Sequence, residues 1–197
     1  MTVSEDFLRS ANRQFLYYKT LGEKAMAQLE AEQLFISLNE DTNSIAVIVK
    51  HLHGNMMSRW TDFLTTDGEK EWRNRDGEFE EDTSKFDVTE RKAELLKTWN
   101  DGWDCLFTTL NSLKPEDLSR IIYIRNEGHT ALEAINRQLA HYPYHIGQIV
   151  FYAKLLKKSD WESLSIPKNK SKEYNDDKFS QDKSRKHFTD EELKKLK

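Results

Sequence analysis

Two histidines one helical turn apart have the spacing of metal ligands. His141 and His145 lie in HYPYHIGQIVFYAKLL, which has the apolar periodicity of a helix. Side chains at i and i+4 share one side of a helix, so we expect both imidazoles to point into the protein. As cations they would repel one another, and as neutral rings each needs partners for both nitrogens. A shared divalent ion would satisfy one nitrogen of each ring, and hydrogen bonding in the core is the alternative.

A third ligand is expected on a second helix, where two histidines compete. His51 and His53 lie about 200° apart around that helix, and each lies about 80° from its predicted solvent-facing line, so helical geometry does not choose between them. Their neighbours differ, because His51 shares its flank with polar residues and His53 lies among apolar ones. A polar flank suits a hydrated pocket. We therefore favour His51 as the third ligand and keep His53 as the alternative ligand or a packed core histidine.

Further polar side chains are expected around these histidines. The candidates for supporting the metal or contacting a substrate are Asn55, Arg59, Arg137, Gln148 and Tyr152. The arginines could bind a carboxylate of a substrate or of a thiol cofactor, with ordinary ion pairing as the alternative. The segment HYPYH lacks the glutamate of the HExxH pattern, so a zinc protease is disfavoured.

Four long helices are predicted to position these residues. Apolar side chains recur at three- and four-residue spacing in 4–32, 44–65, 87–113 and 130–158. Two helix starts have the spacing of a capping box, Asp87 with Glu90 and Thr130 with Glu133. The expected fold is all-α, an up-and-down four-helix bundle, in which a metal site is built from side chains that project inward from facing helices.

The remaining segments are predicted to be short or irregular. Residues 67–84 contain two Asp-Gly pairs and are expected to form an ordered but irregular surface connection. Residues 121–124 favour a short extended segment. We expect the bundle to occupy 1–158, and 159–197 to form a polar, lysine-rich extension with a short helix from Thr189.

Composition excludes several classes of protein. Glycine and proline number 7 and 3 among 197 residues, which is too few for turn-rich β folds. No apolar run approaches the roughly 18 residues of a membrane span, and the N-terminus has no signal-peptide character, so we expect a cytoplasmic protein. The net charge is −4 with both signs interspersed, which disfavours nucleic acid as a partner. The single cysteine excludes an internal disulfide.

The sequence resembles the DinB-like superfamily of four-helix bundles, which includes YfiT-like metal-dependent hydrolases and bacterial thiol transferases. The resemblance spans about 3–157 and rests on a helix-two histidine within SIAVIVKHLHGNMMSRW and on the later HxxxH followed by Gly147-Gln148. An uncharacterised bacterial branch is the most similar. The resemblance implies a metal triad of His51, His141 and His145, with the aromatic residues Trp60 and Phe63 in register, whereas Pro143 departs from the pattern.

Two kinds of function follow from these expectations. Three neutral imidazoles would leave a zinc, nickel, iron or manganese ion its full charge and an open position, which suits hydrolysis or thiol transfer on a small molecule. A low-molecular-weight thiol is then a candidate cofactor. The alternative is a non-enzymatic metal-binding helical bundle, with a homodimer as a candidate assembly.

Overall fold

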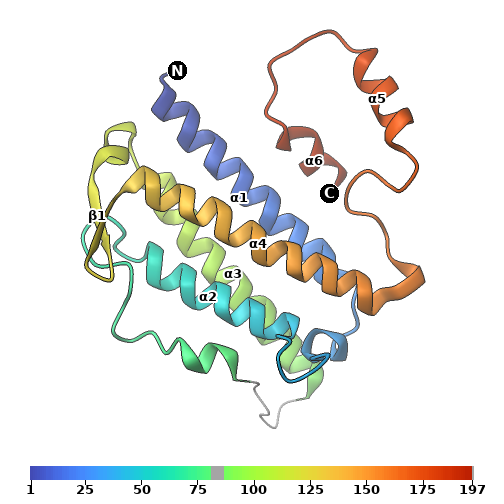
Figure 1. The fold of residues 1–197 in the computed structure, drawn as a ribbon, viewed down its shortest axis with the longest axis horizontal. Coiled ribbons are helices and arrows are strands. Elements are labelled where there is room, and N and C mark those ends of the chain that lie inside the picture. Colours follow the sequence, from blue (N-terminus) through green and yellow to red (C-terminus); the bar gives the residue numbers. More distant parts are fainter. Residues whose placement is uncertain (81–86, 197) are drawn as a thin grey trace.

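Four long helices form the core of the protein (Figure 1). The structure is a computed structural model that describes residues 1–80 and 87–196. The long helices are α1 (Val3–Ala27), α2 (Ile45–Trp60), α3 (Val88–Ser112) and α4 (Ala131–Lys157). The predicted all-α bundle is confirmed. α2, α3 and α4 fall within their predicted ranges, and α1 begins one residue before its range.

Local capping explains where these helices begin. Thr130 and Glu133 form the predicted capping box at the start of α4, and Thr2 and Glu5 form another at the start of α1. The Ser44 hydroxyl accepts a hydrogen bond from the Val47 amide at the start of α2. The predicted box at α3 is not formed, because the Asp87 side chain makes no capping hydrogen bond.

The helix directions differ from a strict up-and-down alternation. α1 and α4 run in one direction, whereas α2 and α3 both run in the other (Figure 1). Asn12 of α1 bonds Asn111 near the end of α3, and Thr109 of α3 bonds the carbonyl of Trp60 at the end of α2. The physical reason is the connection 61–87. It begins at the C-terminus of α2 and leads back to the end of the bundle that holds the N-terminus of α2, so α3 runs in the same direction as α2.

The centre of the bundle is aromatic. Phe15, Trp60, Trp103 and Tyr142 are fully buried, with ring centroids 5.8–6.5 Å from Phe15 to the other three. The Trp60 indole donates to the Tyr142 hydroxyl at 2.9 Å, and that hydroxyl donates to Oδ1 of Asn55 at 3.0 Å. The polar atoms of Trp60 and Tyr142 are therefore satisfied inside the core, where an unpaired group would cost about 1–3 kcal/mol. The buried indole nitrogen of Trp103, in contrast, has no hydrogen-bond partner among the described residues.

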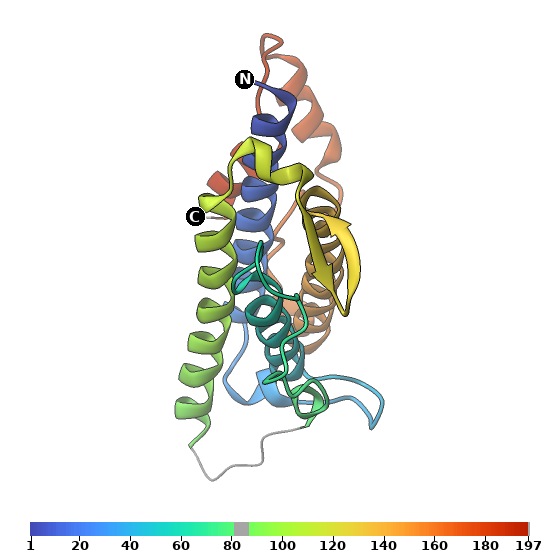
Figure 2. The ribbon, with the colours of Figure 1, turned by 90° about the vertical axis from the view of Figure 1, so that its left-hand side faces the viewer.

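A small hairpin connects α3 to α4 (Figure 2). Strand β1 (Ile121–Ile124), predicted as an extended segment, pairs antiparallel with β2 (Glu127–Thr130). The turn residues Arg125 and Asn126 both have positive φ, as a two-residue hairpin turn of type I′ requires. The Asp67 carboxylate accepts hydrogen bonds from both turn amides at 2.8 Å, so the 61–87 connection is attached to the hairpin.

The C-terminal part contains two short helices, α5 (Ser171–Phe179) and α6 (Thr189–Lys195). The sequence predicted α6 but not α5. α6 packs against α1, and Thr189 and Leu196 are buried there. Among the described helices, none is both long enough and apolar enough to cross a lipid bilayer.

Candidate metal centre

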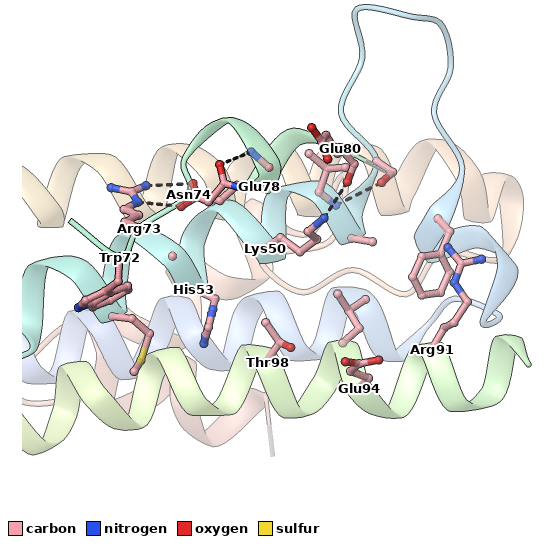
Figure 3. Close-up of a pocket in the computed structure, with 18 residues that line it drawn as sticks. Lys50, His53, Trp72, Arg73, Asn74, Glu78, Glu80, Arg91, Glu94 and Thr98 are labelled. Atoms are coloured by element: carbon pink, nitrogen blue, oxygen red, sulfur yellow. Dashed lines mark hydrogen bonds and ion pairs between the residues drawn. The ribbon is translucent and has the colours of Figure 1, made fainter. Parts of the chain in front are cut away.

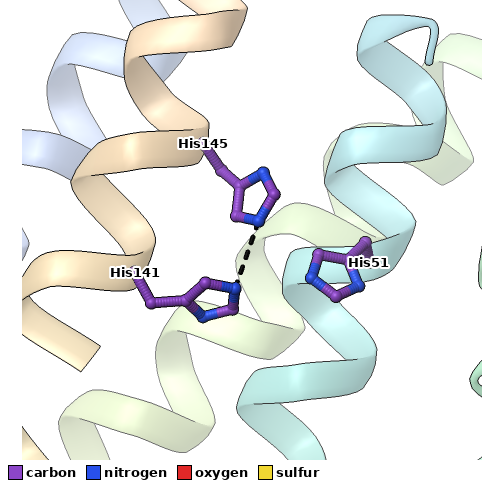
Figure 4. Close-up of side chains that lie close together, drawn as sticks. All are labelled: His51, His141 and His145. Carbon is purple, nitrogen blue, oxygen red and sulfur yellow. Dashed lines mark hydrogen bonds between the residues drawn. The ribbon is translucent and has the colours of Figure 1, made fainter. Parts of the chain in front are cut away.

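The structure brings together three histidines from two helices. His51 projects from α2 toward α4, where His141 and His145 lie one turn apart (Figure 4). One ring nitrogen from each residue lies within 4.8 Å of the other two. α2 and α4 run in opposite directions, which places the middle of α2 beside the middle of α4. His53 is outside this cluster and faces α3. The polar neighbours of His51 on α2 therefore identified which of the two histidines lies beside His141 and His145.

The cluster lies beside the core and not at its centre. His51 is buried, with 6% of its surface exposed, whereas His141 and His145 are half-buried. The inner face of α4 is instead occupied by Tyr142, Ile146 and Ile149. The expectation that the histidines of α4 point into the protein therefore needs a refinement: they flank the core, and one side of the cluster is open to solvent.

Each of the three imidazoles is held through its Nδ1 atom. Nδ1 of His51 lies 3.0 Å from Oε2 of Glu78, and Nδ1 of His145 lies 2.9 Å from Oε1 of Gln148. Nδ1 of His141 lies 3.3 Å from Oε1 of Gln138. These oxygens accept hydrogen bonds, so each Nδ1 carries the proton and each Nε2 keeps its lone pair. Histidines that bind metal ions are commonly oriented in this way.

The geometry of the Nε2 atoms fits a shared cation. Nε2 of His141 and Nε2 of His145 are 3.1 Å apart. With both Nδ1 atoms protonated, two lone pairs face one another at this distance, which is unfavourable unless a cation lies between them. Two nitrogens bound tetrahedrally to one zinc ion at about 2.0–2.1 Å are about 3.4 Å apart, close to the observed separation.

The electrostatic surroundings favour neutral imidazoles. Burial, followed by the nearby His145 and His51, lowers the pKa of His141 from 6.5 to about 4. Burial also lowers the pKa of His145, although its hydrogen bond to Gln148 opposes this. Both rings are therefore neutral at pH 7, which is the form that binds metal ions.

A buried ion pair supports His51 from the other side. Arg73 donates to Glu78 through Nε at 2.7 Å and through Nη2 at 3.0 Å, and its side chain is only 3% exposed. Burial raises the pKa of Glu78, but hydrogen bonds from His51 and Arg73 outweigh it and the net pKa is lowered. Glu78 is therefore a carboxylate, and it fixes the tautomer of His51.

Glycine at position 54 makes room for this carboxylate. A Cβ atom at Gly54 would overlap the Glu78 side chain, whose Cδ would lie only 2.6 Å away. Gly54 lies on α2 three residues after His51, so the carboxylate rests directly on the helix that carries the histidine. The backbone of α2 and the 67–80 segment thus approach closely because residue 54 has no side chain.

A chain of charges continues from the cluster to the hairpin. Glu69 lies 3.5 Å from Arg73, 3.3 Å from Arg59 and 3.0 Å from Arg125 in the hairpin turn. Arg59 also donates to the carbonyl of Gly68. These contacts fix the described part of the predicted irregular connection, 67–80, against α2. Residues 81–84 of that predicted connection lie outside the described residues.

The other predicted site residues have separate roles. Gln148 orients His145, as a supporting residue should. Asn55 accepts from Tyr142 in the core, and Arg59 is engaged with Glu69, which is the ion-pairing alternative. Tyr152 donates to the carbonyl of Ile36 at 2.8 Å. Arg137 is exposed, and its charge contributes to lowering the pKa of His141.

Three supporting residues were missed by the sequence reasoning. Glu78 and Arg73 lie in an irregular segment, where side-chain periodicity gives no direction. Gln138 lies three residues before His141, just as Gln148 lies three residues after His145. That symmetric spacing, glutamine and histidine one turn apart on each side of the pair, is a signal that could have identified Gln138.

Comparison with known protein families adds a classification. Residues 2–170 match a family described as a protein of unknown function, DUF1572. The chain belongs to this family. Neither a curated protein nor a solved structure matches it. The matched region contains the three histidines together with Arg73, Glu78, Gln138 and Gln148.

Proposed function

We propose that this member of the DUF1572 family is a metalloenzyme that holds a divalent metal ion with His51, His141 and His145 and acts on a small molecule in the cytoplasm. The observation that carries the proposal is the set of three Nδ1 hydrogen bonds, which leaves three Nε2 lone pairs facing one region. A cation shared by these atoms also accounts for the 3.1 Å separation between Nε2 of His141 and Nε2 of His145.

Two further features support a catalytic site over a structural one. The ligands are three imidazoles, and two of them are half-buried, so a bound ion would have a side open to solvent. Catalytic metal sites keep such an open position, whereas structural sites are closed by protein ligands. The resemblance to the DinB-like superfamily, with its hydrolases and thiol transferases, agrees with this reading.

Between the two reactions, thiol transfer is the better supported. A bound divalent ion would supply charge that activates water or a thiol. Base-assisted hydrolysis also uses a nearby carboxylate that accepts a proton. Glu78 is unsuited to that role because His51 and Arg73 already bond its two oxygens. A thiol held as thiolate needs no such base. The residues of this chain would then bind the metal, and burial would keep His141 and His145 neutral.

The first test is metal content in protein purified without a histidine tag. We expect one divalent ion per chain in the wild type and loss of the ion in His141→Ala. His53→Ala is the matched control, because His53 is a partly buried histidine on α2 outside the cluster, and it should keep the ion. Equal metal content in all three proteins would refute the assignment of the ligands.

The second test is turnover. The metal-loaded protein is incubated with cysteine or glutathione and the electrophile 1-chloro-2,4-dinitrobenzene, and the thioether product is followed by absorbance. We expect a rate that disappears in His141→Ala and persists in His53→Ala. A site that binds metal but shows no turnover with thiols or with ester and amide substrates would favour the non-enzymatic metal-binding bundle.

A further inference from the structure

A second cavity lies between α2 and α3. It has a volume of about 600 Å³ and is bounded by α2, α3 and the described end of the 61–87 connection (Figure 3). Cavities of roughly 300–1,000 Å³ are typical of small-molecule sites. None of the three clustered histidines lines it, although Arg73 and Glu78, which support His51, form part of its wall.

One part of this cavity contains a lysine that has no ion-pair partner among the described residues. Lys50 is half-buried in its wall, and its Nζ donates to the backbone carbonyl of Glu80 at 2.7 Å. That carbonyl is neutral, and within the described residues no carboxylate lies within 4.0 Å of the ammonium group. The first turn of α2, with Ala46 and Val47, lines the same part and adds the positive end of a helix dipole.

The other part of the cavity is aromatic and apolar. Trp72 is 60% exposed and lines the same cavity as Met57 and His53 (Figure 3). Exposure of so large an aromatic side chain beside a cavity is characteristic of a surface that stacks on a flat ligand. His53, the residue that the sequence offered as an alternative metal ligand, is thus a wall of this second cavity.

Three acidic residues line this cavity, Glu78, Glu80 and Glu94, and Glu78 is paired with Arg73. Glu94 of α3 lies across the cavity from Lys50, and it is exposed (Figure 3). Solvent screens an exposed carboxylate more strongly than a half-buried ammonium group. Glu80 and Glu94 are both exposed, so they oppose the binding of an anion to half-buried Lys50 less than a buried carboxylate would.

We propose that this cavity is a second binding site, for an organic anion with a flat apolar body. The anionic group binds Lys50 near the start of α2, and the flat body stacks on Trp72 and packs against Met57. The inference goes beyond the proposed metalloenzyme function, because none of the three proposed metal ligands lines the cavity, and the anion would bind Lys50, which takes no part in the metal centre.

The experiment uses 8-anilinonaphthalene-1-sulfonate, a flat aromatic sulfonate, as the probe. Calorimetric titration of the full chain at pH 7 is expected to give one site. Lys50→Gln is expected to weaken binding about fivefold to tenfold, since it removes an ion pair in partly screened surroundings. Glu94→Gln, the matched control of opposite sign, should strengthen binding about twofold. Val47→Trp fills the cavity and should abolish binding.

Two further variants complete the design. The probe should quench tryptophan fluorescence in the wild type, and Trp72→Phe should remove most of that quenching. His141→Ala should bind the probe as the wild type does, so failure of the metal proposal and failure of this one are distinguishable. Unchanged affinity in both Lys50→Gln and Val47→Trp would overturn the proposal, and so would binding only to variants that circular dichroism shows to be unfolded.

Discussion

At the scale of single residues, the central feature is that a hydrogen bond at Nδ1 orients each of the three imidazole rings. Spacing alone predicted His141 and His145, and the polar company of His51 distinguished it from His53. The partners of the Nδ1 atoms were harder to predict. Glu78 reaches His51 across 27 residues of chain, and nothing in a helical pattern indicates where a side chain in an irregular connection will lie. Of the three partners of the Nδ1 atoms, the sequence indicated only Gln148.

Substitution of Glu78 tests this orientation. Glu78→Gln keeps an oxygen that can accept from His51 but removes the charge that pairs with buried Arg73. Loss of such a supporting group typically costs about 10–100-fold in metal affinity. We expect a decrease of that size in a competition titration with a zinc chelator. Glu80→Gln, an exposed neighbour, should have no effect, and an equal affinity in the two variants would contradict the supporting role of Glu78.

The lowered pKa of His141 makes a prediction for the metal-free protein. The folded state has a pKa of about 4 and the unfolded state about 6.5, so the unfolded state binds the proton more tightly. The free energy of unfolding should therefore fall as the pH drops from about 6.5 to about 4. Urea denaturation at several pH values measures this slope. His141→Gln should flatten it, and an unchanged slope in that variant would show that His141 is not responsible.

At the scale of elements, apolar periodicity predicted the four long helices but not all of their ends or their directions. The range 44–65 extends five residues past the end of α2, because Asp62 adopts a positive φ and its carbonyl accepts from the Thr65 and Thr66 amides in a turn. α5 was missed because it buries no residue and so has no apolar stripe. Helix direction depends on where the 61–87 connection leads, which periodicity does not encode.

The contact between α2 and the 67–80 segment gives a prediction at this scale. Gly54→Ala places a methyl group where the Glu78 side chain lies, so the carboxylate must move away from His51. We expect lower thermal stability and weaker metal binding, measured by thermal unfolding and chelator competition. Gly147→Ala on α4 is the control: a Cβ there meets nothing within 4 Å, and alanine should stabilise the helix by about 0.5–1 kcal/mol. Equal behaviour of the two variants would argue against close packing at Gly54.

At the scale of the whole molecule, the metal cluster and the second cavity flank the same helix. α2 carries His51 toward α4 and His53 toward α3, so one element supplies a side chain to each site. The predicted division into a bundle of 1–158 and an extension of 159–197 stays a prediction, as does a homodimer. Trp161 and Leu164, just past that boundary, pack against the core.

Truncation tests the division of the chain. A chain that ends at residue 170, where the family match ends, keeps Trp161 and Leu164 but loses α5 and α6. We expect it to unfold in one cooperative transition, at a lower temperature because the contacts of Thr189 and Leu196 near α1 are removed. Its metal content should equal that of the full chain. Loss of cooperative unfolding would show that the extension is part of the folding unit.

The most direct test of the central claim is X-ray absorption spectroscopy of the zinc-loaded, untagged protein. The account predicts nitrogen ligands at about 2.0–2.1 Å, with the outer-sphere scattering of three imidazole rings. In His51→Ala one ring should be lost from that signal, and in His53→Ala all three should remain. A spectrum without imidazole scattering, or one that His51→Ala leaves unchanged, would contradict the three-histidine centre.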